Sequence, residues 1–327
     1  MTPKTSLLRP RRWWMVSVTA MACAVALSAS AFALTITPTF TANFVTDFGS
    51  DAAAAEAAWI AAAHVFTTNF SDNITVNITV NAVAGTSVFG QSLTFLNSFS
   101  YSTLYSAVVN DVKTAADATA TGPGGSVTQI DPISGIHTWW TTTAEAKALG
   151  LIPNNTNTDG TTTFGAGNPF TFSGPITAGT YDFQGVVAHE ISEVLGRLGL
   201  CGGTIGAATN SHSLIDLFSY SGAGTRVLGN GGGANFSFDN GTTLLKSYNN
   251  ASSNGLDCRD WAPGTNDAFN QFANSGVTNP VSDVDLQAMD VIGYDRVAAL
   301  VPEPSTATLL ASALIAVGFF LHRRIKA

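Results

Sequence analysis

Charged residues are scarce in this chain of 327 residues, where Asp, Glu, Lys and Arg together make up 11%, against about 25% in an ordinary soluble domain. Basic residues are the scarcer kind, because 14 Lys and Arg stand against 22 Asp and Glu and give a formal net charge of −8. Nucleic-acid phosphates are bound by clusters of Lys and Arg. The composition therefore argues against a nucleic-acid-binding protein.

The few basic residues gather at the two ends. Four of them lie in residues 1–12 and three in the last five residues, so residues 34–300 hold only seven, together with 21 of the 22 acids. Both ends also carry apolar stretches. We therefore expect targeting segments at the ends and one acidic domain over 34–300.

Residues 1–33 have the pattern of a secretory signal peptide. Basic residues precede an apolar stretch from Trp13 to about Leu27, and Ala31-Phe32-Ala33 supplies a small-residue cleavage pattern. The pattern predicts export through the Sec machinery and removal of this segment. A first transmembrane helix is the alternative.

Residues 301–327 begin with Pro302, Glu303 and Pro304, continue with an apolar run over 307–321 and end with Arg323 and Arg324. This segment resembles a PEP-CTERM sorting tail with its transmembrane segment. The resemblance implies transient anchoring in the inner membrane of a Gram-negative bacterium and cleavage by an exosortase. The mature protein would then reach the cell surface or the extracellular matrix. A plain C-terminal anchor helix is the alternative.

Cysteine is also rare, with three residues in the chain. Cys23 would leave with the signal peptide, so Cys201 and Cys258 remain. An even number of cysteines in an oxidising compartment predicts one disulfide between them. Two free buried thiols are the alternative.

Periodicity and turn residues predict alternating strands and helices in the first half of the domain and a loop-rich C-terminal part. The alternation of Ile, Val and Ala with Asn and Thr over 73–82 predicts a half-buried strand. The other expected elements are a strand over 39–45, a helix over 51–66 capped by Ser50, a helix over 102–118, a strand over 136–142, a short helix over 144–149, loops and hairpins over 153–180, a helix over 182–200, a hairpin at Asn240-Gly241 and a helix over 283–292 capped by Ser282.

The helix over 182–200 carries the residues with chemical potential. His189 and Glu193 are four residues apart and therefore share one helix face, where both can reach one zinc ion. Glu190 lies beside them as a general base that takes a proton from water activated by the metal. The pattern is H-E-x-x-E, not the H-E-x-x-H of zinc peptidases. The alternative is a structural His and an ordinary helix ion pair between Glu193 and Arg197.

The segment AHEISEVLGR (188–197), together with IDLFSYS (215–221), NDAFN (266–270) and SDVDLQAMDVIGYD (282–295), resembles a family of exported zincin-like metalloproteases that often carry such sorting tails. The resemblance implies an α+β, metzincin-like fold with a mixed twisted sheet and an active-site helix. It also implies zinc-dependent hydrolysis of extracellular protein or peptide bonds.

A third zinc ligand is not fixed by the motif. Gly199 stands where metzincins place their third His and has no side chain to bind metal. Asp216 and His212 are the two candidates, and Asp216 is slightly preferred. Three aspartates of a loop-rich stretch form a weaker candidate site for Ca²⁺, whose ligands are oxygens: Asp257, Asp260 and Asp267.

The sequence thus predicts a zinc metalloendopeptidase with Glu190 as its base. The alternative is a non-catalytic protein of the surface or extracellular matrix that keeps the fold with a degenerate site. Occupation of Glu193 by Arg197 would favour that alternative.

Overall fold

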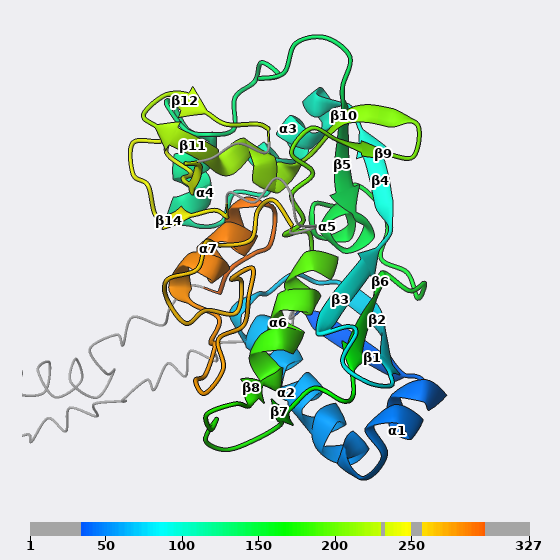
Figure 1. Cartoon of the computed structure of the whole chain (residues 1–327). Helices are drawn as coiled ribbons and strands as arrows, with labels where there is room; N and C mark the ends of the chain where they lie inside the picture. The colour runs from blue at the N-terminus through cyan, green and yellow to red at the C-terminus, as the bar shows by residue number, and fades with distance from the viewer. Residues whose placement is uncertain (1–33, 230–232, 250–256, 298–327) are drawn as a thin grey trace, which may run out of the picture. The chain divides into compact units, whose positions relative to one another are not determined.

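The computed structural model describes residues 34–229, 233–249 and 257–297. They form a mixed α+β fold with three four-stranded sheets and one two-stranded pair (Figure 1). The predicted signal peptide (1–33) and the sorting tail (301–327) lie outside the described residues. Within the described part, no helix combines the length and the apolar character that crossing a membrane requires.

The first sheet positions the candidate site. Its strands are, in spatial order, β1 (Thr35–Phe40), β2 (Thr75–Val83), β6 (Gly160–Gly165) and β3 (Gly90–Thr94). The first three are parallel, and β3 runs antiparallel to β6 at the edge. β2 confirms the predicted half-buried strand, because its apolar residues from Val76 to Ala82 are buried and the Thr and Asn residues between them are partly exposed.

Two long helices pack beside this sheet. α2 (Ala52–Asn69) and α6 (Phe183–Val194) contact each other, and α6 also contacts β3 and β6 (Figure 1). The connection between the parallel strands β1 and β2 runs through α1 (Ala42–Phe48), a short 3-10 turn η1 (Gly49–Asp51) and α2. Parallel neighbours need a crossover of this kind.

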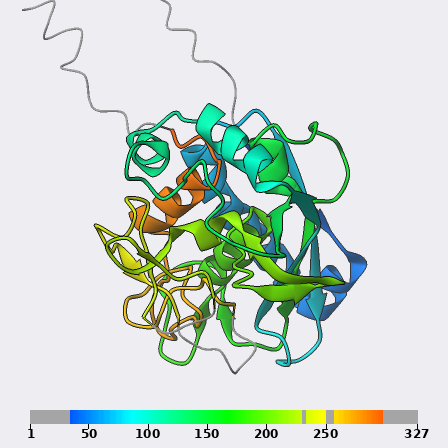
Figure 2. The same cartoon turned by 90° about the horizontal axis from the view of Figure 1, so that it is seen from above.

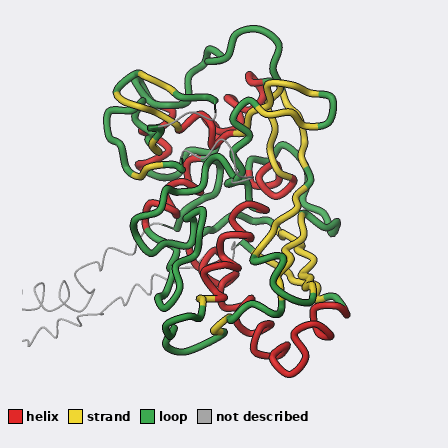
Figure 3. Tube along the Cα trace, in the orientation of Figure 1, coloured by secondary structure: helices red, strands yellow, loops and turns green. Residues whose placement is uncertain are grey.

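The second and third sheets lie above the first sheet in the view of Figure 1, and Figure 2 shows the molecule from that side. The strands of the second sheet are, in spatial order, β4 (Leu96–Phe99), β5 (Thr138–Thr142), β10 (Ala208–Ser213) and β9 (Gly203–Ile205). Those of the third sheet are β12 (Thr225–Arg226), β11 (Ser219–Gly222), β13 (Asn235–Phe236) and β14 (Lys246–Ser247). The other elements are β7 (Phe170–Thr171), β8 (Tyr181–Asp182), α3 (Tyr101–Asn110), α4 (Ala115–Thr121), α5 (Thr143–Ala148), η2 (Leu214–Phe218) and α7 (Asp283–Val291). Loops dominate the described chain after α6, as predicted (Figure 3).

Three predicted elements are wrong in type or extent. The strand expected over 39–45 ends at Phe40, because Thr41 accepts a hydrogen bond from Phe44 N at 3.1 Å and caps α1. The single helix expected over 102–118 is divided into α3 and α4, because Thr114 starts α4 with a capping box. Residues 153–180, expected to be loops and hairpins, contain the central strand β6.

Two helix starts test the predicted caps. Ser282 caps α7 as predicted, since its side chain accepts a hydrogen bond from Asp285 N. Ser50 does not cap α2, which begins at Ala52 after a 3-10 turn and has Asp51 at its N-cap position.

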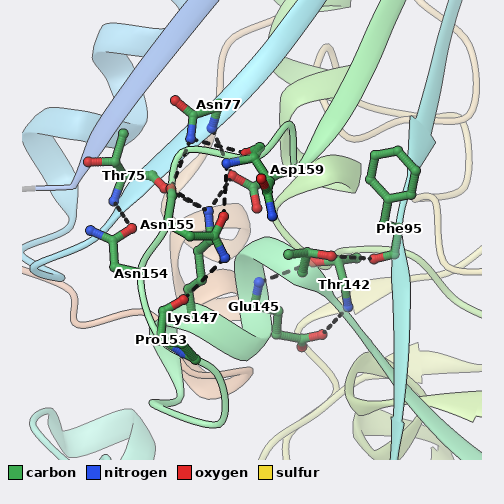
Figure 4. A network of polar contacts seen from close by, with 12 residues as sticks. Thr75, Asn77, Phe95, Thr142, Glu145, Lys147, Pro153, Asn154, Asn155 and Asp159 are labelled. Atoms are coloured by element: carbon green, nitrogen blue, oxygen red, sulfur yellow. Dashed lines mark hydrogen bonds and ion pairs between the residues drawn. The ribbon is translucent and has the colours of Figure 1, made fainter.

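A buried polar network holds the start of β6 against β2 (Figure 4). Lys147 Nζ donates to Asp159 Oδ2 at 2.7 Å and to Thr75 O at 3.1 Å, and the Lys147 and Asp159 side chains are fully buried. The same Asp159 oxygen accepts from Asn77 N at 2.8 Å. Buried charges are tolerated when partners satisfy them in this way, so the network fixes the turn that leads into β6.

Candidate metal centre

The helix α6 begins at a well-satisfied carboxylate. Asp182 accepts hydrogen bonds from Gln184 N at 3.1 Å and from Asn279 N at 2.9 Å. Val187, Ile191 and Val194 are completely buried, and this apolar stripe fixes the rotation of the helix against the core. The rotation turns the motif residues toward a cavity.

The helix is shorter than predicted, because it ends at Val194 and not near 200. Gly196 follows with a φ of +120°, a conformation that side chains disfavour. Arg197 N then bonds Ser192 O at 2.9 Å. The chain therefore turns sharply after the motif, and this turn brings Arg197 beside Glu193.

The motif residues His189, Glu190 and Glu193 line a cavity of about 700 Å³. The edge strand β3 forms one wall, α6 forms the floor, and the loops of the C-terminal part close the other side. The lining residues are Phe89, Gly90, Gln91, Ser92, Thr94, Leu96, Tyr181, Gly185, Val186, Leu198, Asp257, Asp260, Asp267, Ala268, Asn270, Gln271, Phe272, Ala273 and Asn279, besides the motif residues. A cavity of this size accommodates a drug-sized ligand or part of a peptide.

Three potential metal ligands converge in the cavity wall. His189 Nε2 lies 3.3 Å from Glu193 Oε1 and 3.5 Å from Asp260 Oδ1. One ligand atom from each of these residues lies within 4.8 Å of the others. One imidazole and two carboxylates form a donor set that a zinc site can use, with a further position left for water or substrate.

Hydrogen bonds fix the orientation of two of these ligands. His189 Nδ1 donates to the carbonyl of Ala268 at 2.9 Å, so the Nε2 atom faces the carboxylates. Ser92 Oγ donates to Glu193 Oε2 at 2.7 Å, whereas the buried Oε1 atom makes no hydrogen bond. Partners of this kind orient metal ligands in proteins. The buried Oε1 atom, which lies 3.3 Å from His189 Nε2 and 3.6 Å from Arg197 Nη2, is suited to bind a cation.

The electrostatics of His189 lead to the same conclusion. In a neutral ring that donates through Nδ1, the Nε2 lone pair would face oxygens of Glu193 and Asp260. That arrangement is favourable only when a proton or a metal ion lies between them. Burial opposes the charged ring, yet Asp260 and Glu193 outweigh it and raise the pKa of His189 to about 10.

The carboxyl groups are crowded and poorly solvated. Burial raises the pKa of Glu190 and of Asp260, and burial together with Glu193 raises the pKa of Asp257 to about 7. Glu193 is the exception, because His189 overcomes the effect of burial and lowers the pKa of Glu193 to about 2. A site of this kind favours an added cation, because the cation lets the carboxyl groups ionise together.

Arg197 supplies part of the positive charge from behind the ligands. Its Nη1 atom donates to Asp260 Oδ1 at 2.7 Å, and its Nη2 atom lies 3.6 Å from Glu193 Oε1. Its Nε atom donates to Ser192 Oγ at 2.7 Å, and the guanidinium lies 4.5 Å above the ring of Phe269. Arg197 thus bonds Asp260 directly and also forms the expected i,i+4 ion pair with Glu193.

Neither of the two predicted third ligands lies in this cluster. Asp216 is buried elsewhere, where it accepts hydrogen bonds from backbone N–H groups at Leu200, Cys201 and Ser213 and from Arg259 Nε. This carboxylate organises the turn after α6.

His212, the other predicted ligand, packs against Trp139 with 5.5 Å between ring centroids and bonds Asn210 Oδ1 through Nε2 at 3.0 Å. Burial lowers the pKa of His212 despite the nearby Asp216. His212 thus lies in β10 beside β5, apart from the metal cluster.

The predicted disulfide between Cys201 and Cys258 is present, with 6.5 Å between the Cα atoms. It brings the segment that carries Asp260 to the end of α6. Gly199 permits this approach, because a methyl group there would lie 2.1 Å from Arg259 Cγ and 2.8 Å from Cys258 Sγ. The disulfide could have indicated Asp260, two residues beyond Cys258, as a ligand.

All three aspartates considered for Ca²⁺ line the cavity. Of the three, Asp260 belongs to the cluster with His189 and Glu193, whereas Asp267 forms an ion pair with Lys246. The cluster of Cys201, Asp216 and Cys258 has the spacing of a metal site, but its two sulfur atoms are bonded to each other.

Comparison of the chain with protein-family models, with curated proteins and with solved structures found no match. Any functional assignment therefore depends on the residues and on the geometry of the cavity.

Proposed function

We propose that this protein is a zinc-dependent peptidase in which His189, Glu193 and Asp260 hold the metal and Glu190 transfers protons. The convergence of one imidazole and two carboxylates in the wall of a large cavity is the observation that carries this proposal. The buried Glu193 Oε1 atom without a hydrogen bond supports it, because the donor set has a place for a cation.

A metal ion held there would act as a Lewis acid on a peptide carbonyl and would make a bound water more acidic. Glu190 is suited to accept a proton from that water and to deliver it to the leaving amine. Its carboxyl group lies against β3, since a methyl group on Gly90 would lie 2.3 Å from Glu190 Oε1. Burial raises the pKa of Glu190, which brings a carboxyl group closer to the value that a general base needs.

The edge strand β3 is suited to bind an extended substrate. Within the described residues, β3 pairs with β6 on one side only, and several of its residues line the cavity. A peptide can add to such an edge through main-chain hydrogen bonds. A peptide bound there would pass Glu190 and the proposed metal ligands.

A zincin-like fold is part of the same proposal. The mixed sheet with an antiparallel edge strand next to the motif helix agrees with the zincin-like architecture that the sequence resemblance implies. The disulfide suits an oxidising compartment. We infer an exported enzyme that acts on proteins or peptides at the cell surface or in the extracellular matrix, after processing by the Sec machinery and an exosortase.

The contact between Arg197 and Asp260 supports a second candidate function. A guanidinium 2.7 Å from the carboxylate neutralises Asp260 without any metal. A matrix or surface protein that has lost catalysis could retain the fold in this form.

Metal analysis and hydrolysis of casein distinguish the two functions. The enzyme predicts one zinc per chain in the purified native protein. It also predicts that Glu190→Gln lowers the rate about 100-fold or more, the usual contribution of a general base, while the zinc content is unchanged. A native protein that binds no zinc from a zinc-containing buffer and leaves casein intact would identify the scaffold.

A further inference from the structure

Arg197 is a cation next to a site that would bind another cation, and this is its unusual feature. The side chain is 1% exposed and does not line the cavity. It lies behind Glu193 and Asp260, on the side away from the substrate space. Coulomb repulsion alone would make such a residue unfavourable for metal binding.

The contacts of Arg197 hold it in one orientation. Nε donates to Ser192 Oγ at 2.7 Å, and Ser192 Oγ donates in turn to His189 O at 2.6 Å. The guanidinium also stacks on Phe269, whose neighbour Ala268 accepts the hydrogen bond from His189 Nδ1. Arg197 is therefore linked through Ser192 to the backbone of His189, and through Phe269 to the segment whose Ala268 carbonyl orients the His189 ring.

From this fixed position Arg197 reaches both carboxylate ligands. Nη1 bonds Asp260 Oδ1 at 2.7 Å, and Nη2, a buried nitrogen without a hydrogen bond, lies 3.6 Å from Glu193 Oε1. Asp260 comes from a loop, whereas Glu193 comes from α6. A planar guanidinium can fix the spacing of two such groups, which the single ammonium of Lys cannot do.

We propose that Arg197 is a positioning residue that holds Asp260 in register with His189 and Glu193, so that the three bind a divalent metal ion together. The inference depends on the proposed function, because it concerns the same site. It goes beyond that function in giving the buried cation a favourable role in metal binding despite its charge.

The sign of the effect on metal affinity tests this role. Arg197→Met removes a positive charge near the metal, so electrostatics alone predicts tighter binding of Zn²⁺. Positioning predicts the opposite, a loss of tenfold or more, in the range seen when groups that orient metal ligands are removed. Arg197→Lys keeps the charge but loses the planar guanidinium that contacts both carboxylates, and it should also bind Zn²⁺ more weakly.

Zn²⁺ affinity is measured by competition with a chromophoric chelator, using the full protein. Lys147→Met is the matched control, because Lys147 is also deeply buried and pairs with an aspartate, Asp159, outside the metal cluster. It should retain Zn²⁺ affinity within about threefold. The double variant Arg197→Met/Asp260→Asn should lose little more Zn²⁺ affinity than Asp260→Asn alone, because the effects of substitutions at coupled residues do not add.

Each outcome decides one question. Wild type without Zn²⁺ binding overturns the proposed function and this inference together. Wild type that binds Zn²⁺, with Arg197→Met binding equally or more tightly, overturns the positioning role alone. An equal loss in Lys147→Met also overturns it, because general loosening of the fold would then explain the result. If Arg197→Met does not fold, Ser192→Ala decides instead, and an unchanged Zn²⁺ affinity in that variant refutes the role.

Discussion

Asp260→Asn and Asp216→Asn are chemically identical changes in two buried ion pairs. The Arg197–Asp260 pair has its closest N–O distance at 2.7 Å and the Arg259–Asp216 pair at 2.8 Å. All four side chains are at most 4% exposed. Only Asp260 belongs to the proposed metal site, so the two variants separate the effect on stability from the effect on metal binding.

The loss of stability should be similar in the two variants. Removing one partner of a buried ion pair costs about 3–5 kcal/mol, because the other charge stays buried without compensation. For a domain of this size, each kcal/mol shifts the midpoint of thermal unfolding by about 2–4 °C. We therefore expect Asp260→Asn and Asp216→Asn each to lower the midpoint by roughly 10 °C in the absence of metal.

The response to zinc should differ between them. At about 1,000 times the wild-type Kd, zinc adds ~4.1 kcal/mol to the stability of the folded state. Asp216→Asn should keep this gain. If Asp260→Asn weakens zinc binding about 100-fold, the gain falls to ~1.4 kcal/mol.

Thermal unfolding followed by circular dichroism, with and without zinc, measures both quantities in one experiment. The direct Kd from chelator competition provides an independent value. Equal stabilisation of Asp260→Asn and Asp216→Asn by zinc would show that Asp260 is not a ligand and would refute the assigned site.

Three further changes test other parts of the structure. Gly90→Ala should displace the Glu190 carboxyl group and lower the rate of hydrolysis about 100-fold without loss of zinc. The control Gly222→Ala, whose new methyl group meets no atom within 4 Å, should keep the wild-type rate. Equal rates in the two variants would refute the role of Glu190 as the base. Replacing Cys201 and Cys258 by Ser, which opens a link across 57 residues, should cost about 4 kcal/mol, and calorimetry that finds an unchanged midpoint would contradict it. Burial raises the pKa of Asp72 to about 7, so the folded state keeps a proton that the unfolded state loses near pH 4, and stability should fall as pH rises from 4 to 7. Asp72→Asn should reduce this dependence and add about 4 kcal/mol at pH 8. Denaturant unfolding that gives the same pH slope of stability in both proteins would exclude this role of Asp72.

The parts of the fold that local pattern determines were predictable. The alternation over 73–82 gives β2, and Ser282 caps α7, because each depends on residues close in sequence. β6 has no such signal, since its Gly- and Thr-rich sequence resembles a loop. Thr162 is nevertheless buried there because its hydroxyl accepts a hydrogen bond from Trp59 Nε1 at 3.1 Å. Only the tertiary structure provides that partner.

The same distinction between local and non-local contacts applies to the proposed third ligand, Asp260. Helix geometry alone brings His189 and Glu193 together, and the structure has them 3.3 Å apart. Asp260 reaches them by three non-local contacts: the disulfide, the close approach at Gly199 and the bond to Arg197.

Each of these contacts had a sequence signal when taken separately. The cysteine pair was predicted to bond, Gly199 stood where a metzincin ligand was missing, and Arg197 was expected to pair with a carboxylate, that of Glu193. A search for ligands next to predicted cross-links, and not only at the spacing of known motifs, would have included Asp260. Residues next to a cross-linked cysteine in the sequence must lie within the length of a few residues from the cross-link. The predicted disulfide therefore narrowed the set of candidates for the proposed third ligand more than motif spacing did.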